Sequence, residues 1–341
     1  MNNNWHPSAD LETLKKRAQF IADVRLFFAR KGMLEVDTPI LSRAAPTAPY
    51  LDSFKTHYIP LGTDQKQDYY LQTSPEFAMK RLLAAGSSSI YQIAKVFRNG
   101  ERGKYHIPEF TMLEWYRIEL SLDELMDEVN ELLASIFAIT SSTRLSYQQV
   151  FKQSLNIDVF AISDSEVEQL AKQHLPNVSE NIHLDRDGWL ELLMSEVIEP
   201  KLAELAQAVF IFDFPASQAQ LAKVKLDKQG HQVAARFELY IRGIEIANGY
   251  DELLDADELR QRFDQDNHQR RELNKQVMPI DDNLLDARQE GLPQCTGVAL
   301  GLDRLVMIVL DKQAIVEVLS FSLALSINKL SINEKECYRL F

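Results

Sequence analysis

The sequence predicts an α+β fold, in which helices flank a mainly antiparallel sheet. Strand-like stretches at 89–98 and 110–117 flank a polar loop, and those at 236–241 and 244–247 flank a short turn containing Gly243. Both pairs have the form of hairpins, which join antiparallel strands. Helical patterns lie between these pairs, so we expect helices to cover the sheet.

The first predicted helix covers residues 10–31, where apolar residues recur at helical spacing. Asp10 is its expected N-cap and Gly32 its expected C-terminal stop. Pro75 is expected in the first turn of a helix that continues to Leu83. The other predicted elements are strands at 33–36, 69–72, 208–214 and 297–300, a surface loop over 42–68, helices at 122–137, 257–275 and 301–310, and a mostly helical stretch over 147–204.

The bulk composition is that of a protein able to bury a full core, with 341 residues, 45% hydrophobic and 26% charged. No apolar run approaches the roughly 20 residues that span a bilayer, and the N-terminus lacks the pattern of a secretory signal. Two cysteines, Cys295 and Cys337, form no disulfide framework. We therefore expect a cytoplasmic protein without a membrane partner.

The net charge of −13 argues against a broad nucleic-acid-binding surface, which needs basic side chains to neutralise phosphates. The basic clusters, at 15–17 and 270–271, are small and have acidic neighbours. They are typical of solvated helix faces. We expect no dedicated nucleic-acid-binding domain.

The first segment whose residues could form a binding or catalytic site runs from Phe97 to Arg117. Side chains alternate along a strand, so Phe110, Met112, Glu114 and Tyr116 share one face. A carboxylate and a phenol beside an aromatic ring can form the floor of a site for a cation. A half-exposed sheet face that happens to carry Glu114 is the alternative, and periodicity alone favours it.

The second segment carries Glu238, Glu245 and Glu252 at seven-residue intervals. Gly243 and the prevalence of β-forming residues exclude a helix there. Carboxylates on neighbouring strands can hold Mg²⁺ or an ammonium group. Unpaired acids on a sheet surface are the alternative, slightly favoured from these residues alone.

The third segment runs from Gly297 to Leu305. A strand ends at Gly301, and the following helix has Asp303 and Arg304 in its first turn. Glycine lets a ligand approach the backbone, and a helix N-terminus favours anions. Such a pattern is common and by itself fixes no function.

Taken in this order, the three segments resemble the signature motifs of class II aminoacyl-tRNA synthetases. They are most similar to the lysyl branch, and within it to the short paralogues that attach β-lysine to elongation factor P. The resemblance covers residues 5–321, and its most specific strings are Thr73–Glu76, Pro108–Arg117, Phe214–Ala219 and Gly297–Gly301.

The length of the chain before the first motif favours the short paralogues. Lysyl-tRNA synthetases carry an oligonucleotide-binding barrel of about a hundred residues before this core. Here the first core helix is expected to begin at Asp10. The resemblance thus implies one catalytic domain over 5–322, no anticodon-binding domain, and a mobile C-terminal extension over 323–341.

The resemblance implies ATP as cosubstrate, Mg²⁺ as metal, and a role for particular residues. Arg98 and Arg304 are the implied catalytic residues, and Phe110 is expected to stack on adenine. The implied ATP contacts are Arg98, Asn99, His106, Phe110, Glu245, Ile246, Gly301 and Arg304. The implied Mg²⁺ ligands are Glu238 and Glu245. The implied amino acid contacts are Ser74, Pro75, Glu76, Glu114, Tyr116, Asn248, Glu252 and Ala299.

Three positions depart from the lysyl pattern. Ala299 stands where lysyl-tRNA synthetases have glycine, and its methyl group should disfavour α-lysine against a β-amino acid by about 1–3 kcal/mol. Gly100 stands where the family usually has glutamate, with Glu101 next as the candidate substitute. Ile107 stands where the family has asparagine. The last two imply weaker ATP binding.

The implied reaction is activation of (R)-β-lysine as an acyl-adenylate, followed by transfer to a lysine of elongation factor P. Residues 32–39 match the motif that forms the dimer interface in relatives, so a homodimer is expected. A truncated lysyl-tRNA synthetase that charges tRNA is one alternative. A regulator that binds an amino acid or ATP is another. Asparagine-forming relatives fit less well, because the pocket acids suit a cationic substrate.

Overall fold

The computed structural model describes residues 5–176, 178–179, 182–205 and 207–322, which form two compact units. The first unit contains the described residues of 1–121 and 252–329, and the second those of 122–251. The predicted C-terminal extension at 323–341, with Cys337, lies outside the described residues.

Helix α1 (Leu11–Arg30) confirms the predicted N-terminal helix and both of its ends. The Asp10 Oδ1 atom accepts a hydrogen bond of 2.7 Å from the Thr13 backbone N–H, which satisfies one of the donors left free at a helix start. Beyond the last turn, Gly32 has φ +69°, a conformation that side chains disfavour. The caps therefore set the two ends of this helix through local contacts.

The larger sheet of the first unit places the first and third sequence segments side by side. Strand β6 pairs antiparallel with β5 and with β12, whereas β1 pairs parallel with β5. Glu114 on β6 lies opposite Gln92 of β5 and Ala299 of β12. The predicted hairpin is confirmed. The strands are β1 (Leu34–Glu35), β5 (Ile90–Phe97), β6 (Glu109–Ile118) and β12 (Cys295–Gly301).

A second, three-stranded sheet in the first unit was not predicted. It has the order β2 (Leu41–Ser42), β4 (Gln67–Leu71), β3 (Lys55–Tyr58), with antiparallel pairing throughout. The prediction of a surface loop over 42–68 is therefore wrong at β3 and at the start of β4. Three of the four β3 residues are exposed, so the strand lacks the apolar alternation by which sequence patterns reveal strands.

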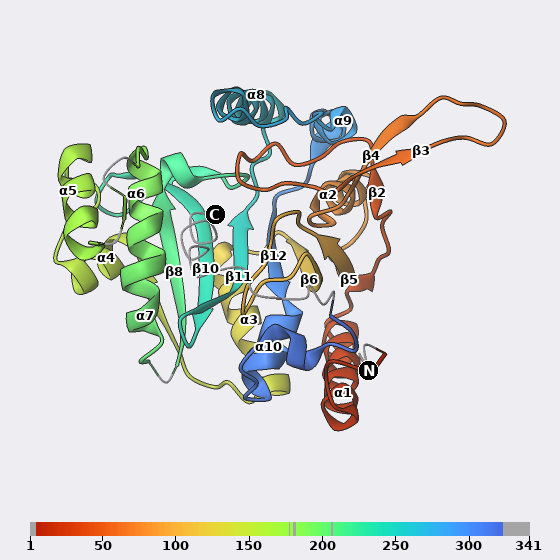
Figure 1. The fold of residues 1–341 in the computed structure, drawn as a ribbon, viewed down its shortest axis with the longest axis horizontal. Helices are drawn as coiled ribbons and strands as arrows, with labels where there is room; N and C mark the ends of the chain where they lie inside the picture. The colour runs from red at the N-terminus through yellow and green to blue at the C-terminus, as the bar shows by residue number, and fades with distance from the viewer. Residues whose placement is uncertain (1–4, 177, 180–181, 206, 323–341) are drawn as a thin grey trace. The chain divides into compact units, whose positions relative to one another are not determined.

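The helices of the first unit include one, α9, that the sequence patterns did not separate from its surroundings. It packs against α2 (Figure 1). Pro75 occupies the N-cap position of α2 rather than its first turn, so that part of the prediction is wrong by one residue. The helices are α2 (Glu76–Ala84), α8 (Ala256–Glu272), α9 (Asp282–Gly291), α10 (Leu302–Val309) and a 3₁₀ turn (Ile315–Val318).

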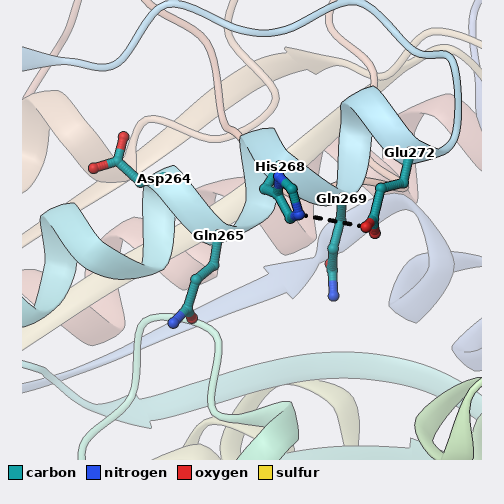
Figure 2. Close-up of a pocket in the computed structure, with 5 residues that line it drawn as sticks. All are labelled: Asp264, Gln265, His268, Gln269 and Glu272. Carbon is teal, nitrogen blue, oxygen red and sulfur yellow. Dashed lines mark ion pairs between the residues drawn. The ribbon is translucent and has the colours of Figure 1, made fainter.

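Helix α8 carries a surface pocket whose lining comes from its own polar side chains (Figure 2). Within it, His268 Nε2 lies 3.3 Å from Glu272 Oε1, one turn along the helix, and both side chains are mostly exposed. An exposed pair of this kind contributes little to stability. The lining residues are Asp264, Gln265, His268, Gln269 and Glu272.

The sheet of the second unit carries the second sequence segment on a hairpin. Strand β10 pairs antiparallel with β11, β8 and β9, and β8 pairs parallel with β7. A bulge interrupts the β10–β11 register between Leu239 and Tyr240. The short strands β7 and β9 were not predicted. The strands are β7 (Ser142–Ser146), β8 (Ala208–Pro215), β9 (Val224–Leu226), β10 (Gln232–Ile241) and β11 (Ile244–Asp251).

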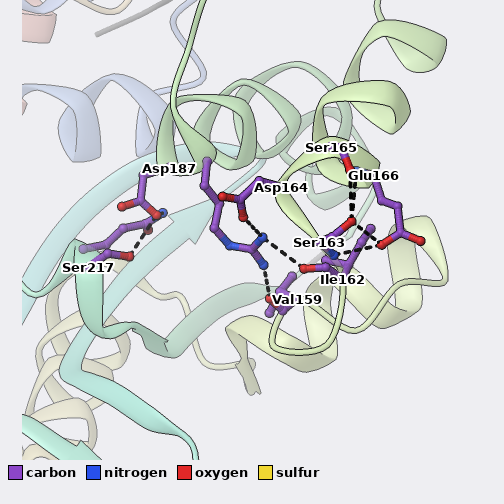
Figure 3. Close-up of polar contacts among 10 residues, drawn as sticks. Val159, Ile162, Ser163, Asp164, Ser165, Glu166, Asp187 and Ser217 are labelled. Atoms are coloured by element: carbon purple, nitrogen blue, oxygen red, sulfur yellow. Dashed lines mark hydrogen bonds and ion pairs between the residues drawn. The ribbon is translucent and has the colours of Figure 1, made fainter.

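Helices pack on this second sheet as the patterns predicted, including the mostly helical stretch. A capping box begins α5, where the Ser163 and Glu166 side chains each bond the other's backbone N–H (Figure 3). Arg186 on α6 joins Asp164 of α5 at 2.7 Å. The helices are α3 (Leu122–Phe137), α4 (Tyr147–Leu155), α5 (Asp164–His174), α6 (Arg186–Leu193), a π-helical turn (Met194–Ile198) and α7 (Glu199–Leu202).

Both units combine antiparallel strand pairs with packed helices, so the predicted α+β class is confirmed. None of the helices in the described part of the chain has the length and apolar character that crossing a membrane requires.

Candidate active site

A buried carboxylate, Glu114, lies at the centre of the first unit's larger sheet. Its Oε2 accepts a hydrogen bond from Ser74 Oγ and its Oε1 one from Tyr116 Oη, each of 2.6 Å. The predicted sharing of one strand face by Glu114 and Tyr116 is thus confirmed. Burial, and then the charge of Glu76, raise the pKa of Glu114 to about 7. The site contains a carboxylate held by neutral donors, which suits a cationic ligand.

Two further carboxylates of the predicted pocket meet a lysine that sequence reasoning missed. The fully buried Lys80 of α2 makes ion pairs with Glu76 and Glu252, and its Nζ lies 5.6 Å from the ring centroid of Tyr116. Burial opposes the charge on Lys80, but Glu252 and Glu76 together raise its pKa. The available signal was the four-residue spacing of Glu76 and Lys80, which places them on one helix face.

A glycine of β12 makes room for this group. Gly297 lies opposite Tyr116 in the β6–β12 register. A Cβ atom at Gly297 would stand 2.3 Å from Tyr116 Cε1 and 2.7 Å from Glu252 Oε1, closer than atoms approach in proteins. Any side chain at position 297 would clash with the Tyr116 ring, so the pairing of β6 with β12 requires glycine there.

Arg98 lies at the end of β5, where the hairpin loop begins. Its backbone N–H donates to Pro108 O at 2.9 Å, and its guanidinium carbon lies 5.2 Å from the ring centroid of Phe110. Its Nη1 also donates to Glu101 Oε1 at 3.4 Å. The structure thus brings together the predicted phosphate-binding arginine and the aromatic ring predicted to stack on adenine.

The departure at Gly100 has a local structural basis. Gly100 has φ +89°, which glycine adopts without strain, and the preceding Asn99 N–H donates to Asp52 O at 2.7 Å. The loop turns here, and the next residue, Glu101, directs its carboxylate to Arg98. Glu101 therefore contacts the implied catalytic residue Arg98, and its action on ATP in place of the motif glutamate stays a prediction.

The third segment is anchored by a buried aspartate. Asp303 Oδ1 accepts a hydrogen bond of 2.6 Å from Arg17 Nη2, and its Oδ2 one of 2.7 Å from the Thr111 backbone N–H. Next to it, Arg304 Nε donates to Tyr105 O at 3.1 Å. These bonds fix the start of α10 against β6 and against the loop between β5 and β6.

The remaining predicted residues of the first unit lie around this arrangement. Ala299 packs with Phe110 against a small apolar cluster of β5 and β6. Gly301 ends β12 opposite Met112, and His106 accepts a backbone bond of 3.0 Å from Gly103 N–H. The first and third segments are thus confirmed as neighbours.

The second unit holds an acidic group on β10 and β11. Glu238 forms an ion pair with Arg236 and accepts a hydrogen bond of 2.6 Å from Tyr240 Oη. Burial raises the pKa of Glu238 to about 7, Arg236 opposes the shift, and Glu245 adds to it. Asn248 lies opposite Glu238 across the strands, and its buried Oδ1 receives no hydrogen bond from the described residues.

The predicted Mg²⁺ ligands, Glu238 and Glu245, fit that ion in type. Mg²⁺ usually takes one or two protein carboxylates together with substrate phosphates and water. Within the described ranges, no group of three or more histidine, cysteine, aspartate or glutamate side chains is placed to bind a metal by itself. Ile246, which follows Glu245 on β11, is buried. Glu252, the third member of the series, instead belongs to the Lys80 group of the first unit.

Comparison with known proteins agrees with the motifs. Residues 7–324 match the family model described as tRNA synthetases class II (D, K and N). A protein of Edwardsiella ictaluri named Elongation factor P–(R)-β-lysine ligase is 47% identical over 320 residues, which are 94% of this chain and 97% of that protein. A protein of the same name from Photorhabdus laumondii is 46% identical, over 94% of this chain and 98% of that protein. Another from Yersinia enterocolitica is 47% identical, over 93% of this chain and 97% of that protein.

These matches extend over nearly the whole chain and include the strands that carry the buried carboxylates. The chain therefore belongs to the class II tRNA synthetases (D, K and N), in the group of its Elongation factor P–(R)-β-lysine ligase relatives, and it is a ligase.

Proposed function

We propose that this protein activates (R)-β-lysine with ATP and transfers the β-lysyl group to the ε-amine of a lysine on elongation factor P. One observation carries the proposal: Glu114 is a buried carboxylate held by the neutral donors Ser74 and Tyr116. Such a group can receive an ammonium group, and relatives that share this chain's length bear the matching name.

In the first step, a carboxylate oxygen of β-lysine attacks the α-phosphorus of ATP. A new P–O bond forms, the bond to the bridging oxygen breaks, and pyrophosphate leaves with its electron pair. Arg98 contacts both the attacking carboxylate and the α-phosphate, because its planar guanidinium offers paired donors to each. The Phe110 ring beside this guanidinium supports its orientation. Arg304 stabilises the charge on the outer phosphates.

In the second step, the neutral ε-amine of the acceptor lysine attacks the acyl carbon of the adenylate. An amide bond forms, AMP leaves, and the proton of the amine is released. Neither step requires a side-chain nucleophile. Holding the reactants in line can supply about 7–11 kcal/mol of the barrier reduction.

The rest of the proposed site follows the family assignments. ATP contacts Asn99, His106, Phe110, Ile246 and Gly301, in addition to the two arginines. The amino acid contacts Pro75, Glu76, Asn248, Glu252 and Ala299, in addition to Ser74, Glu114 and Tyr116. Glu238 and Glu245 would hold Mg²⁺, which, when bound, offsets phosphate charge.

Mass spectrometry of elongation factor P tests the proposal directly. The factor is incubated with this protein, ATP, Mg²⁺ and either β-lysine or α-lysine. We expect one lysine to gain one lysyl unit, with β-lysine preferred because of the Ala299 methyl group. Charging of tRNA without modification of the factor would instead identify a tRNA synthetase. Binding of amino acid without return of labelled pyrophosphate to ATP would identify a regulator.

The affinity for β-lysine should depend on pH through Glu114. As the pH falls through about 7, Glu114 takes up a proton and loses the charge that attracts ammonium. We therefore expect KM for β-lysine to rise about tenfold per pH unit below that point. Pyrophosphate exchange at a series of pH values measures it. Glu114→Gln should have a high KM with a flatter profile, and a flat profile in the unaltered protein would contradict the role.

Gly297→Ala should raise KM for β-lysine by about tenfold, because the added methyl group displaces the buried Tyr116 ring or the Glu252 carboxylate. The change in KM is measured by the same exchange reaction. Gly62→Ala is the control for backbone strain alone, since Gly62 has φ +81° but a Cβ there meets nothing within 4 Å, so this variant should keep the normal KM. An unchanged KM in Gly297→Ala would show that the Tyr116–Glu252 arrangement does not contact the substrate.

Two further expectations belong to the proposal. A ligase that modifies a translation factor acts where that factor works, in the cytoplasm.

Around the motif expected at a dimer interface, the described residues include Leu34, Ile40 and Leu41, which are 53%, 42% and 48% exposed. Exposed apolar residues at this density support a homodimer through residues 32–39 and their neighbours.

A further inference from the structure

Arg288 on α9 is a buried arginine whose hydrogen-bond donors are unused. The residue is 4% exposed, and its Nε, Nη1 and Nη2 atoms donate to no acceptor among the described residues. A guanidinium group stays charged at neutral pH and normally has several acceptors when buried. Burial lowers the pKa of Arg288, while Glu252 and Glu76 favour its charged form.

The surroundings of Arg288 place its charge at the amino acid pocket. Helix α9 packs against α2, which carries Glu76 and Lys80 (Figure 1). The Glu252 backbone N–H donates to Cys295 O at 3.1 Å. Glu252, Glu76, Cys295 and Tyr116 are among the groups that influence the charge of Arg288, and Arg288 in turn opposes the charge of Lys80. Cys295 and Tyr116 belong to an apolar cluster with residues of α2 and β5. Charges in such apolar surroundings act on one another more strongly than in water.

The acidic residues of the amino acid pocket differ in whether their partners are charged or neutral. Lys80 forms ion pairs with both Glu76 and Glu252, and Arg288 adds a second positive charge near the same two acids. Glu114, by contrast, has the neutral hydrogen-bond partners Ser74 and Tyr116, and the charge of Lys80 affects it least. The Oε1 atom of Glu252 accepts no hydrogen bond from the described residues. Glu252 thus keeps a buried lone pair without a donor among the described residues, in a field that Arg288 makes more positive.

We propose that Arg288 sets the charge selectivity of the amino acid pocket by weakening the attraction of Glu252 for the distal ammonium group of the substrate. The proposal rests on the proposed function, since it concerns the amino acid of that reaction. Arg288 acts through Glu252 and is a positioning residue for selectivity. Glu114 then carries the larger part of ammonium recognition.

Arg288→Leu tests the proposal, because leucine suits the apolar cluster and removes the charge. Binding of lysine and β-lysine is measured by calorimetry, and KM and kcat by pyrophosphate exchange. We expect the Kd and KM of both diamino acids to fall about tenfold, with kcat changed less than about twofold. An analogue in which a methyl group replaces the distal amino group should bind as it does to the unaltered protein.

Two controls separate charge from shape. Arg288→Lys keeps the positive charge and should keep the unaltered selectivity between the diamino acids and the methyl analogue. The gain from Arg288→Leu should vanish when it is combined with Glu252→Gln and persist when it is combined with Glu114→Gln. Thermal melting reports whether each variant folds. If the leucine variant does not fold, Arg288→Met, which keeps most of the side-chain length, takes its place.

The outcomes distinguish this inference from the proposed function. Equal shifts for the diamino acids and the methyl analogue, or the same gain in Arg288→Lys, would overturn the role of the Arg288 charge. A weaker affinity for diamino acids in Arg288→Leu would overturn its direction. Failure of the unaltered protein to bind or activate any lysine isomer would instead remove the proposed function.

Discussion

Arg98→Ala is expected to lower the rate of amino-acid-dependent pyrophosphate exchange by roughly a thousandfold, the scale found when a group that stabilises transition-state charge is removed. Arg98 stands at the start of the loop between β5 and β6, with its guanidinium beside Phe110 and within reach of Glu101. In the proposed reaction it offers paired donors to the substrate carboxylate and to the α-phosphate. Alanine removes both contacts.

The loss should come from chemistry rather than unfolding. The Arg98 side chain is 29% exposed, and its ion pair to Glu101 is long at 3.4 Å. Truncation of such a side chain usually changes the free energy of unfolding by less than about 1 kcal/mol. The melting temperature should therefore stay close to that of the unaltered protein.

Two matched variants make the result specific. Arg98→Lys keeps the charge but loses the planar pair of donors, so it should retain only a small part of the activity. Arg81→Ala removes an exposed arginine of α2 and should leave exchange unchanged. Exchange within a few-fold of normal in Arg98→Ala would remove Arg98 from the reaction.

Asp303→Ala should destabilise the first unit by about 3–5 kcal/mol, because it leaves the Arg17 guanidinium without its buried partner. The Asp303 side chain is 1% exposed and bonds both Arg17 and the Thr111 backbone N–H. It therefore ties α1, β6 and the start of α10 together. Chemical denaturation followed by tryptophan fluorescence measures the free energy of unfolding.

Asp303→Asn and Glu168→Ala serve as controls. Asparagine can still accept the bond from Thr111 but loses the charge that pairs with Arg17, so an intermediate loss is expected. Glu168 pairs with Lys172 at 2.6 Å on the surface of α5, where both side chains are about two-fifths exposed. Its removal should change the free energy of unfolding by less than about 1 kcal/mol. Equal losses of unfolding free energy in Asp303→Ala and Glu168→Ala would show that the buried Asp303–Arg17 contact stabilises the protein no more than an exposed ion pair does.

The sequence by itself determined the features that depend on neighbours along the chain. The cap at Asp10 and the stop at Gly32 involve residues within one helical turn, and the structure confirms both. The shared face of Glu114 and Tyr116 follows from the alternation of a strand, and their hydrogen bond confirms it. The family strings were informative for the same reason, because each is a continuous run of residues.

Only the tertiary structure decided which charges meet. Lys80 and Arg288 come from helices far apart in the sequence, and α9 must pack on α2 before both can act on Glu252. The exposed strand β3 likewise forms through its pairing with β4. Periodic patterns do not show which distant segments pair, because burial and partner choice arise only when those segments pack together. Local patterns thus predicted most of the helices and the central strands, whereas packing decided the exposed strands and the charge balance of the pocket.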